Sequence, residues 1–347
     1  MKARRTGYDR QYTVDSPINY TILLGASLLF WMIGYKTAAD YPVQIGGDIA
    51  ATPIYELIYL AMPGKAVACL IGILLTLAGA FLLHRANYLM IIIREKTVMP
   101  FLFYVLFISS NPGGYPLNTT TSGMFCLMLA FYRLLTSYNE IGAIRKAFNI
   151  GLFTGLASLL WVHALWFIPL LWWGMYSFKA LTLRTLLSSI IGIAVNYWFL
   201  LGWCVIQHNF TIFSLIFAPL MEIGPASEIT ANLQPADWIN ITYIAFLSMI
   251  AIINILLHEH DDNLRTRRYL SFLIVFLIVS AGLLVLYNRH PYEFLNAACI
   301  PASILSAHFF TVQKGRKTLW LYYILTIPFI IISLLQSLWI SSLNMVI

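Results

Sequence analysis

Long apolar runs separated by short polar segments dominate the sequence. A helix needs about 20 apolar residues to cross the roughly 30 Å of hydrocarbon in a bilayer. Such runs recur along the whole chain, so we predict an all-α polytopic transmembrane bundle of about eleven spans in a single domain, 1–347. The candidate spans are 19–36, 65–84, 97–111, 121–137, 149–162, 164–178, 185–206, 237–257, 269–287, 293–311 and 318–342.

The apolar run over residues 149–178 needs a separate argument. Lys146 precedes it, and Lys179 and Arg184 follow it. One straight helix would place these bases on opposite sides of the membrane. Two short helices that bend near His163 would return both ends to the same side. We therefore predict a hairpin.

Basic residues then give the orientation. With the N-terminus inside, 18 of the 21 Lys and Arg residues fall on the inner side, and only Lys36, Lys65 and Arg289 fall outside. This segregation is typical of positive-inside insertion. It predicts an N-in, C-out membrane protein. Residues 1–18 form a basic cytoplasmic arm that is not cleaved, and 37–64 and 207–236 form the two large outer loops.

Composition supports the membrane interpretation. Hydrophobic residues make up 60% of the chain and charged residues 10%, with a mean hydropathy of +0.78. Soluble domains carry about 25% charged residues, so a soluble enzyme is excluded. The net charge of +7 comes from singly scattered bases, which indicates topology rather than a nucleic-acid partner. All four cysteines lie in apolar runs, so we expect buried thiols without a disulfide or a metal.

The first outer loop carries acidic candidates. Asp40 and Asp48 follow the first span. Thr52 can cap a helix of about ten residues that ends at Pro63-Gly64 and is too short to span a bilayer. We expect this helix to lie on the membrane surface with Glu56 on its wet side. The alternative is that these acids are solvated loop residues.

The second large outer loop is unusually apolar. Phe210, Phe213 and Phe217 suit a short helix that lies in the interface or dips into the membrane. Such a helix could close a lipid-accessible groove, or it could act as an interfacial anchor only.

The last outer turn is the most specific feature. Arg289 is followed closely by His290, Tyr292 and Glu293. The planar donor fork of an arginine at a membrane boundary can bind a phosphate. The alternatives are an anchor for phospholipid headgroups and a salt bridge to Glu293.

The remaining histidines carry weaker signals. His163 at the predicted bend either belongs to a functional site or only caps backbone carbonyls. We expect His308 to form a hydrogen bond with a neighbouring helix. The run His-Glu-His-Asp-Asp at 258–262 looks like a metal cluster but lies beside three arginines. We interpret it as a solvated face. No motif for a metal site or a soluble cofactor is present.

Three stretches resemble known families. Residues 149–174 (N-I-G-L-F-T-G-L-A-S-L-L-W-V-H-A-L-W-F-I-P-L-L-W-W-G) resemble a helix pair of GT-C glycosyltransferases, polytopic enzymes that use polyprenyl-phosphate sugars. Residues 289–301 (R-H-P-Y-E-F-L-N-A-A-C-I-P) resemble their late arginine-tyrosine turn. Residues 94–104 (R-E-K-T-V-M-P-F-L-F-Y) resemble an uncharacterised family of bacterial inner-membrane proteins more closely. This resemblance implies a multi-pass protein of the bacterial inner membrane.

The GT-C resemblance implies an activity. It makes Asp40, with Asp48 in reserve, the catalytic acid of the first outer loop, as a base or a ligand for a divalent metal. Arg289 would hold the leaving phosphate. We add His290, Tyr292, Glu293, Glu56 and His163 as further candidate substrate-binding residues. The implied partner is a lipid-linked substrate or phospholipid. The alternative is a non-catalytic membrane subunit or lipid-binding protein of an envelope assembly, with a membrane protein as partner.

Overall fold

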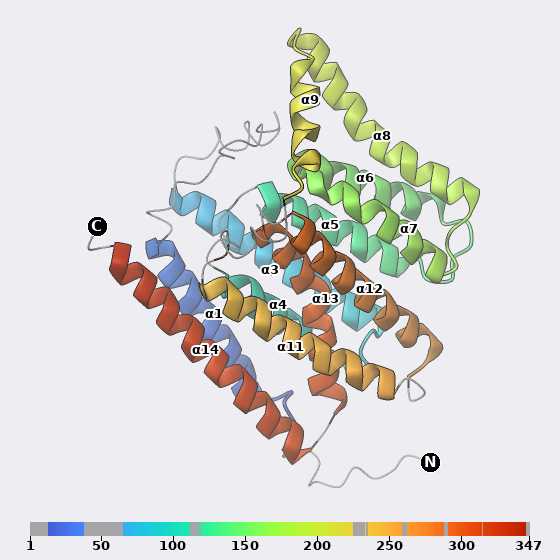
Figure 1. The fold of residues 1–347 in the computed structure, drawn as a ribbon. Helices are drawn as coiled ribbons and strands as arrows, with labels where there is room; N and C mark the ends of the chain where they lie inside the picture. The colour runs from blue at the N-terminus through green and yellow to red at the C-terminus, as the bar shows by residue number, and fades with distance from the viewer. Residues whose placement is uncertain are drawn as a thin grey trace.

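A computed structural model describes residues 13–37, 65–111, 117, 119–224, 233, 235–258, 262–287, 291–313 and 315–344 (Figure 1). Helices fill most of these ranges, and no strand occurs within them. The α-helices are α1 (Pro17–Thr37), α3 (Lys65–Met90), α4 (Met99–Ser109), α5 (Thr119–Thr136), α6 (Ile144–Leu160), α7 (Ile168–Ser177), α8 (Leu183–Ile206), α9 (Thr211–Phe217), α11 (Pro235–Leu257), α12 (Leu264–Leu286), α13 (Pro291–Val312) and α14 (Arg316–Asn344). Two 3₁₀ helices, η1 (Val162–Phe167) and η2 (Ala218–Met221), follow α6 and α9.

Within the described residues, seven helices are long and apolar enough to cross a membrane: α1, α3, α8, α11, α12, α13 and α14. They coincide with seven of the predicted spans. The other four predicted spans correspond to shorter helices. For example, α4 has 11 residues and reaches only about 16 Å, roughly half of the hydrocarbon thickness. The described residues are thus all-helical, with seven helices that suit a multi-pass membrane protein, whereas the count of eleven spans stays a prediction.

The hairpin predicted for residues 149–178 is confirmed. Helix α6 ends at Leu160 because Trp161 adopts an extended backbone conformation, with φ −141° and ψ 99°. His163 lies in η1, which leads into α7. The backbone N–H of Asn139 before α6 donates to the carbonyl of Phe178 after α7, at 2.8 Å. The two ends of the hairpin therefore lie together.

Helix α13 is the centre of the bundle. Every residue from 293 to 311 is buried, and α13 packs against α4, α11 and α12. Phe310 on this helix stacks on Phe103 of α4 at 5.8 Å between ring centroids. A helix that is apolar on most sides and enclosed by others is typical of a core helix. Any polar side chain on α13 consequently lies inside the protein.

Helices α8 and α9 form an arm that projects from the bundle (Figure 1). A Cβ added to Gly151 of α6 would lie 1.9 Å from the carbonyl oxygen of Ser189 on α8, so the two backbones are in direct contact. After the tip of the arm, α9 and η2 return to the bundle. The arm has its own small apolar cluster, which includes Leu159, Cys204 and Ile216 and is separate from the main core.

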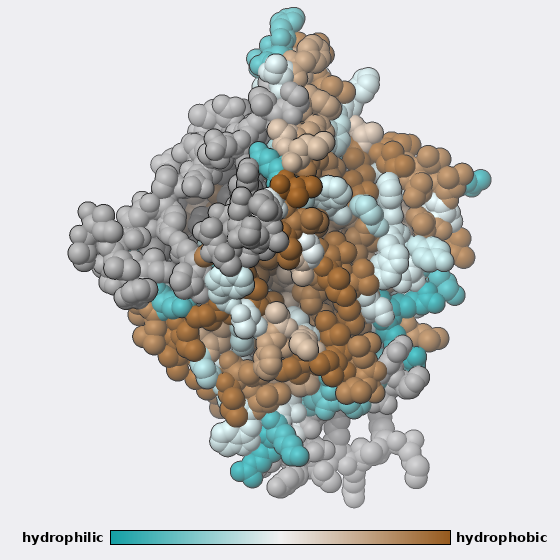
Figure 2. Space-filling model, viewed as in Figure 1, coloured by the Kyte–Doolittle hydropathy of each residue, from teal (hydrophilic) through white to brown (hydrophobic). Residues whose placement is uncertain are grey.

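The surface of the bundle fits a lipid environment. Figure 2 shows hydrophobic residues over most of the coloured part of this face, with hydrophilic residues at the tip of the arm, toward the opposite end and in patches along the sides. Large apolar side chains on α8 are widely exposed, among them Trp198 and Phe199. The four cysteines are buried and unpaired, as expected from their apolar surroundings.

Candidate functional site

Polar contacts gather at the two ends of α13. We call these the Glu293 end, at the start of α13, and the Asp262 end, where Asp262 approaches His308 near the close of α13. Polar side chains within a transmembrane bundle are costly and commonly mark functional positions.

At the Glu293 end, one carboxylate oxygen receives contacts from two aromatic side chains. The indole N–H of Trp161 donates to Oε2 of Glu293 at 2.5 Å. Nδ1 of His163 lies 3.0 Å from the same oxygen, which is ion-pair distance, although the angle is not that of a hydrogen bond. His163 is 1% exposed and Glu293 8% exposed. The bend after α6 therefore carries both residues onto the first turn of α13.

An aromatic cage surrounds the imidazole of His163. The ring centroids of Tyr287 and Phe294 lie 4.7 Å and 5.4 Å from that of His163, both edge-on. Edge-to-face aromatic pairs of this kind contribute about 0.5–1.5 kcal/mol beyond the area they bury. The cage fixes the plane of the imidazole relative to Glu293.

The segment η2 covers this cluster. Nε2 of His163 lies 3.3 Å from the carbonyl oxygen of Pro219, and the hydroxyl of Tyr287 donates to the carbonyl of Leu220 at 2.8 Å. The apolar second loop thus does form a short helix, and its continuation closes over the Glu293 end.

A second buried carboxylate lies at the same end. The hydroxyl of Tyr292 donates to Oδ2 of Asp237 at 2.7 Å, and Asp237 is 2% exposed. Asp237 is in the first turn of α11, where the helix dipole favours a negative charge. Sequence reasoning missed this residue. The available signal was an acid at the very start of an apolar span.

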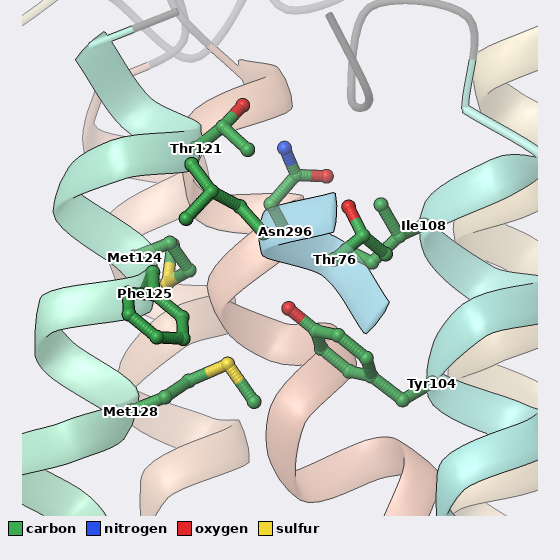
Figure 3. Close-up of a pocket in the computed structure, with 9 residues that line it drawn as sticks. Thr76, Tyr104, Ile108, Thr121, Met124, Phe125, Met128 and Asn296 are labelled. Carbon is green, nitrogen blue, oxygen red and sulfur yellow. The ribbon is translucent and has the colours of Figure 1, made fainter. Parts of the chain in front are cut away.

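An asparagine layer continues inward from Glu293. Nδ2 of Asn111 lies 3.4 Å from Oδ1 of Asn296, and Nδ2 of Asn240 donates to the carbonyl of Ser110 at 2.8 Å. Asn296 also borders a small cavity of about 10 Å³, which is about the room one water molecule needs. Figure 3 shows the side chains of Thr76, Tyr104, Ile108, Thr121, Met124, Phe125, Met128 and Asn296 around it.

The Asp262 end contains an ion pair between a buried aspartate and a partly exposed arginine. Nε of Arg94 donates to Oδ1 of Asp262 at 2.5 Å, and Nε2 of His308 lies 3.8 Å from Oδ2. Asp262 is only 6% exposed, so interpreting all of 258–262 as a solvated face was wrong for this residue. Asp262 can be buried because its charge is paired with Arg94, which lies 168 positions earlier in the sequence. The predicted hydrogen bond from His308 to a neighbouring helix is not found among the described residues, where neither of its ring nitrogens has a hydrogen-bond partner.

Aromatic and backbone contacts hold the arginines of α12 at the same end. The guanidinium of Arg265 lies over the rings of Tyr138 and Tyr269, and Nη1 of Arg268 donates to the carbonyl of Ser177 at 2.5 Å. Because Ser177 ends the hairpin, these contacts join α12 to α7. Arg94, Arg265 and Arg268, which were predicted to lie on the same side of the membrane, therefore lie at one end of the bundle.

The predicted site residues fall into two groups. His163, Tyr292 and Glu293 lie in described segments and meet at the Glu293 end. The others, Asp40, Asp48, Glu56, Arg289 and His290, lie outside the described residues, as does the predicted surface helix. In sequence, Arg289 and His290 directly precede α13. Among the described residues there is no group of three or more His, Cys, Asp or Glu side chains that could bind a metal ion.

Fold and site together define a multi-pass helical membrane protein with a polar cluster buried at one end of its central helix. The chain belongs to the Family of unknown function (DUF6427), whose model matches residues 57–344. The match covers all seven membrane-length helices except α1. No curated protein matches the sequence.

Proposed function

We propose that this protein is a GT-C-like glycosyltransferase that acts on a polyprenyl-phosphate-linked sugar at the outer face of the bacterial inner membrane. The observation that supports the proposal is the buried cluster of Trp161, His163 and Glu293 beneath the apolar segment η2. A substrate with a polar reactive head and a long apolar tail suits a site where a carboxylate lies beside apolar surface.

The orientation is part of the proposal. Arg94, Arg265 and Arg268 lie at the Asp262 end, which suits the cytoplasmic side under the positive-inside rule. The Glu293 end then faces outward, with the N-terminus inside and the C-terminus outside. In this arrangement Asp40 acts on the acceptor, with Asp48 in reserve, and Arg289 holds the departing phosphate.

The alternative is a non-catalytic membrane subunit or a lipid-binding protein. It is favoured by the exposed apolar face of the arm, where Trp198 is 74% exposed, Phe199 72% and Ile206 71%. Such a face suits bulk lipid or a membrane-protein partner. Here the polar cluster would bind a lipid headgroup without chemistry.

Lipid extraction tests the two functions against each other. The protein is purified in mild detergent, and its bound lipids are extracted and identified by mass spectrometry. The transferase proposal expects polyprenyl phosphate, free or sugar-linked, strongly enriched over its share of membrane lipid. Phospholipids alone, in membrane proportions, would favour the alternative. If transfer is then reconstituted, Asp40→Asn should abolish it without altering the melting temperature.

A further inference from the structure

The open end of the hairpin lies at the Asp262 end of the bundle, where two chain connections meet. The backbone N–H of Asn139, between α5 and α6, donates to the carbonyl that follows α7 at 2.8 Å. The hydroxyl of Ser188 on α8 donates to the carbonyl of Ile144 at the start of α6, at 3.0 Å. Helix α8 is long enough to cross a membrane, and it begins here at Leu183. The two connections therefore lie together where a membrane-length helix ends.

Exposed basic and apolar side chains share these two connections. The bases have no acid to neutralise them, because Glu140 is the only acid between positions 119 and 221 and it is paired with Lys146 at 2.6 Å. Within the described part of the chain, none of the other three exposed bases of the two connections forms an ion pair. We call these bases and two apolar neighbours the basic–apolar patch: Ile141, Arg145, Lys179, Leu183 and Arg184.

The two apolar side chains of the patch are largely exposed. Ile141 is 82% exposed and Leu183 is 74% exposed. Each lies close to a base in the sequence, since Leu183 directly precedes Arg184 and Ile141 comes four residues before Arg145. An apolar side chain in the acyl region with a base at the headgroups is typical of segments that lie in a membrane interface. The patch therefore fits a lipid surface in both of its parts.

We propose that the basic–apolar patch binds the headgroups of anionic phospholipids. Its bases contact the lipid phosphates, while Ile141 and Leu183 enter the acyl region beside them. Free phosphate would contact the bases but would leave both apolar side chains in water, so a lipid is the ligand that the whole patch favours. The inference concerns the end of the hairpin away from the bend after α6, and it does not depend on the proposed function.

Lys179 provides a variant that removes charge without damage to the fold. Its backbone is in the left-handed region, with φ 57°. A side chain with a Cβ is strained there, whereas glycine adopts this conformation readily. Lys179→Gly should therefore keep or raise the melting temperature while it takes one positive charge from the patch. A loss of lipid binding in this variant reports the charge and not the fold.

Native mass spectrometry of the full chain in detergent tests the site. The probes are tetraoleoyl cardiolipin, which is anionic, and dioleoyl phosphatidylcholine, which has no net charge. The wild type should prefer cardiolipin, and Lys179→Gly and Arg184→Gln should each weaken its binding about fivefold. Arg316→Gln is the matched control, because it changes the net charge equally on α14, which packs against α1, α11 and α13. Equal binding of both lipids, or an equal effect of all three substitutions, would overturn the site.

Two further arms separate a lipid from other ligands. Inorganic phosphate in millimolar excess should leave cardiolipin bound, and displacement would show that the patch binds phosphate alone. A spin label on Ile141→Cys, in a Cys-less background in cardiolipin-containing nanodiscs, should be more accessible to molecular oxygen than to a water-soluble nickel chelate. The opposite order would place this side chain in water or against a soluble partner, and it would overturn the membrane contact.

Discussion

Replacement of Gly151 by alanine tests whether the contact between α6 and α8 positions the site. The added Cβ would lie 1.9 Å from the carbonyl oxygen of Ser189, whereas ordinary contact begins near 3.4 Å. The two backbones would have to separate by about 1.5 Å. Two interhelical hydrogen bonds would stretch with them, Ser188 to the carbonyl of Ile144 and Asn196 to the carbonyl of Leu152, both 3.0 Å long.

The expected loss follows from these terms. Overpacking a tight contact costs about 1–3 kcal/mol, and alanine recovers about 0.5–1 kcal/mol through its helix propensity. Each stretched hydrogen bond contributes roughly another 0.6 kcal/mol. We therefore expect Gly151→Ala to destabilise the protein by about 2 kcal/mol. At about 2 °C for each kcal/mol in a long chain, the melting temperature should fall by roughly 4 °C.

The assay is thermal unfolding in detergent. It measures the fraction of the protein that still elutes as a single species after heating. Gly202→Ala is the matched control, because Gly202 lies on α8 with nothing within 4 Å of an added Cβ. It should melt at or slightly above the wild-type temperature. If Gly151→Ala melts like Gly202→Ala, then α6 and α8 are not in contact as described, and the argument that α6 positions Trp161 loses its basis.

The other predictions concern charge, capping and orientation. Asp262→Asn should lower the free energy of unfolding by about 1–2 kcal/mol, because it leaves Arg94 without its buried partner. Glu140→Gln, at a more exposed pair, should lower it by less than about 1 kcal/mol. Equal melting temperatures for the two variants would contradict this. Thr182→Ala removes the side chain that accepts from the backbone N–H of Thr185 at the start of α8. Thermal unfolding should show a loss of about 1 kcal/mol in the free energy of unfolding. An unchanged melting temperature would refute the cap. In a Cys-less background, an impermeant maleimide applied from outside should label a cysteine at position 207 but not one at 265, and the reverse pattern would invert the topology.

Sequence pattern predicted the helices well because span length and apolar content directly reflect the thickness of the membrane. The hairpin at 149–178 was predictable for the same reason, since only a bend returns Lys146 and Lys179 to one side. The membrane role of the shorter helices was not predictable. A helix such as α4 is apolar on all sides both when it spans a membrane and when other helices enclose it.

The candidate site was only partly predictable. Glu293 and His163 were named separately, but their contact depends on the bend at Trp161 and on 130 residues of intervening fold. Nothing in the sequence distinguishes Trp161 from the other tryptophans as the partner of Glu293. Asp237 was missed because an acid at the start of a span reads equally well as a loop residue. Long-range contacts of this kind are set by helix packing, which a local pattern does not encode.

Selective lipid binding tests the central claim most directly. Native mass spectrometry would compare undecaprenyl phosphate with phosphatidylglycerol on the wild type, on Arg289→Lys and on Arg316→Lys, a control at the start of α14. The proposed function predicts clear preference for undecaprenyl phosphate. It also predicts a loss of roughly tenfold in Arg289→Lys, because an ammonium lacks the forked contact with phosphate, and no change in Arg316→Lys. Equal binding of both lipids in all three proteins would contradict a lipid-phosphate site at the Glu293 end.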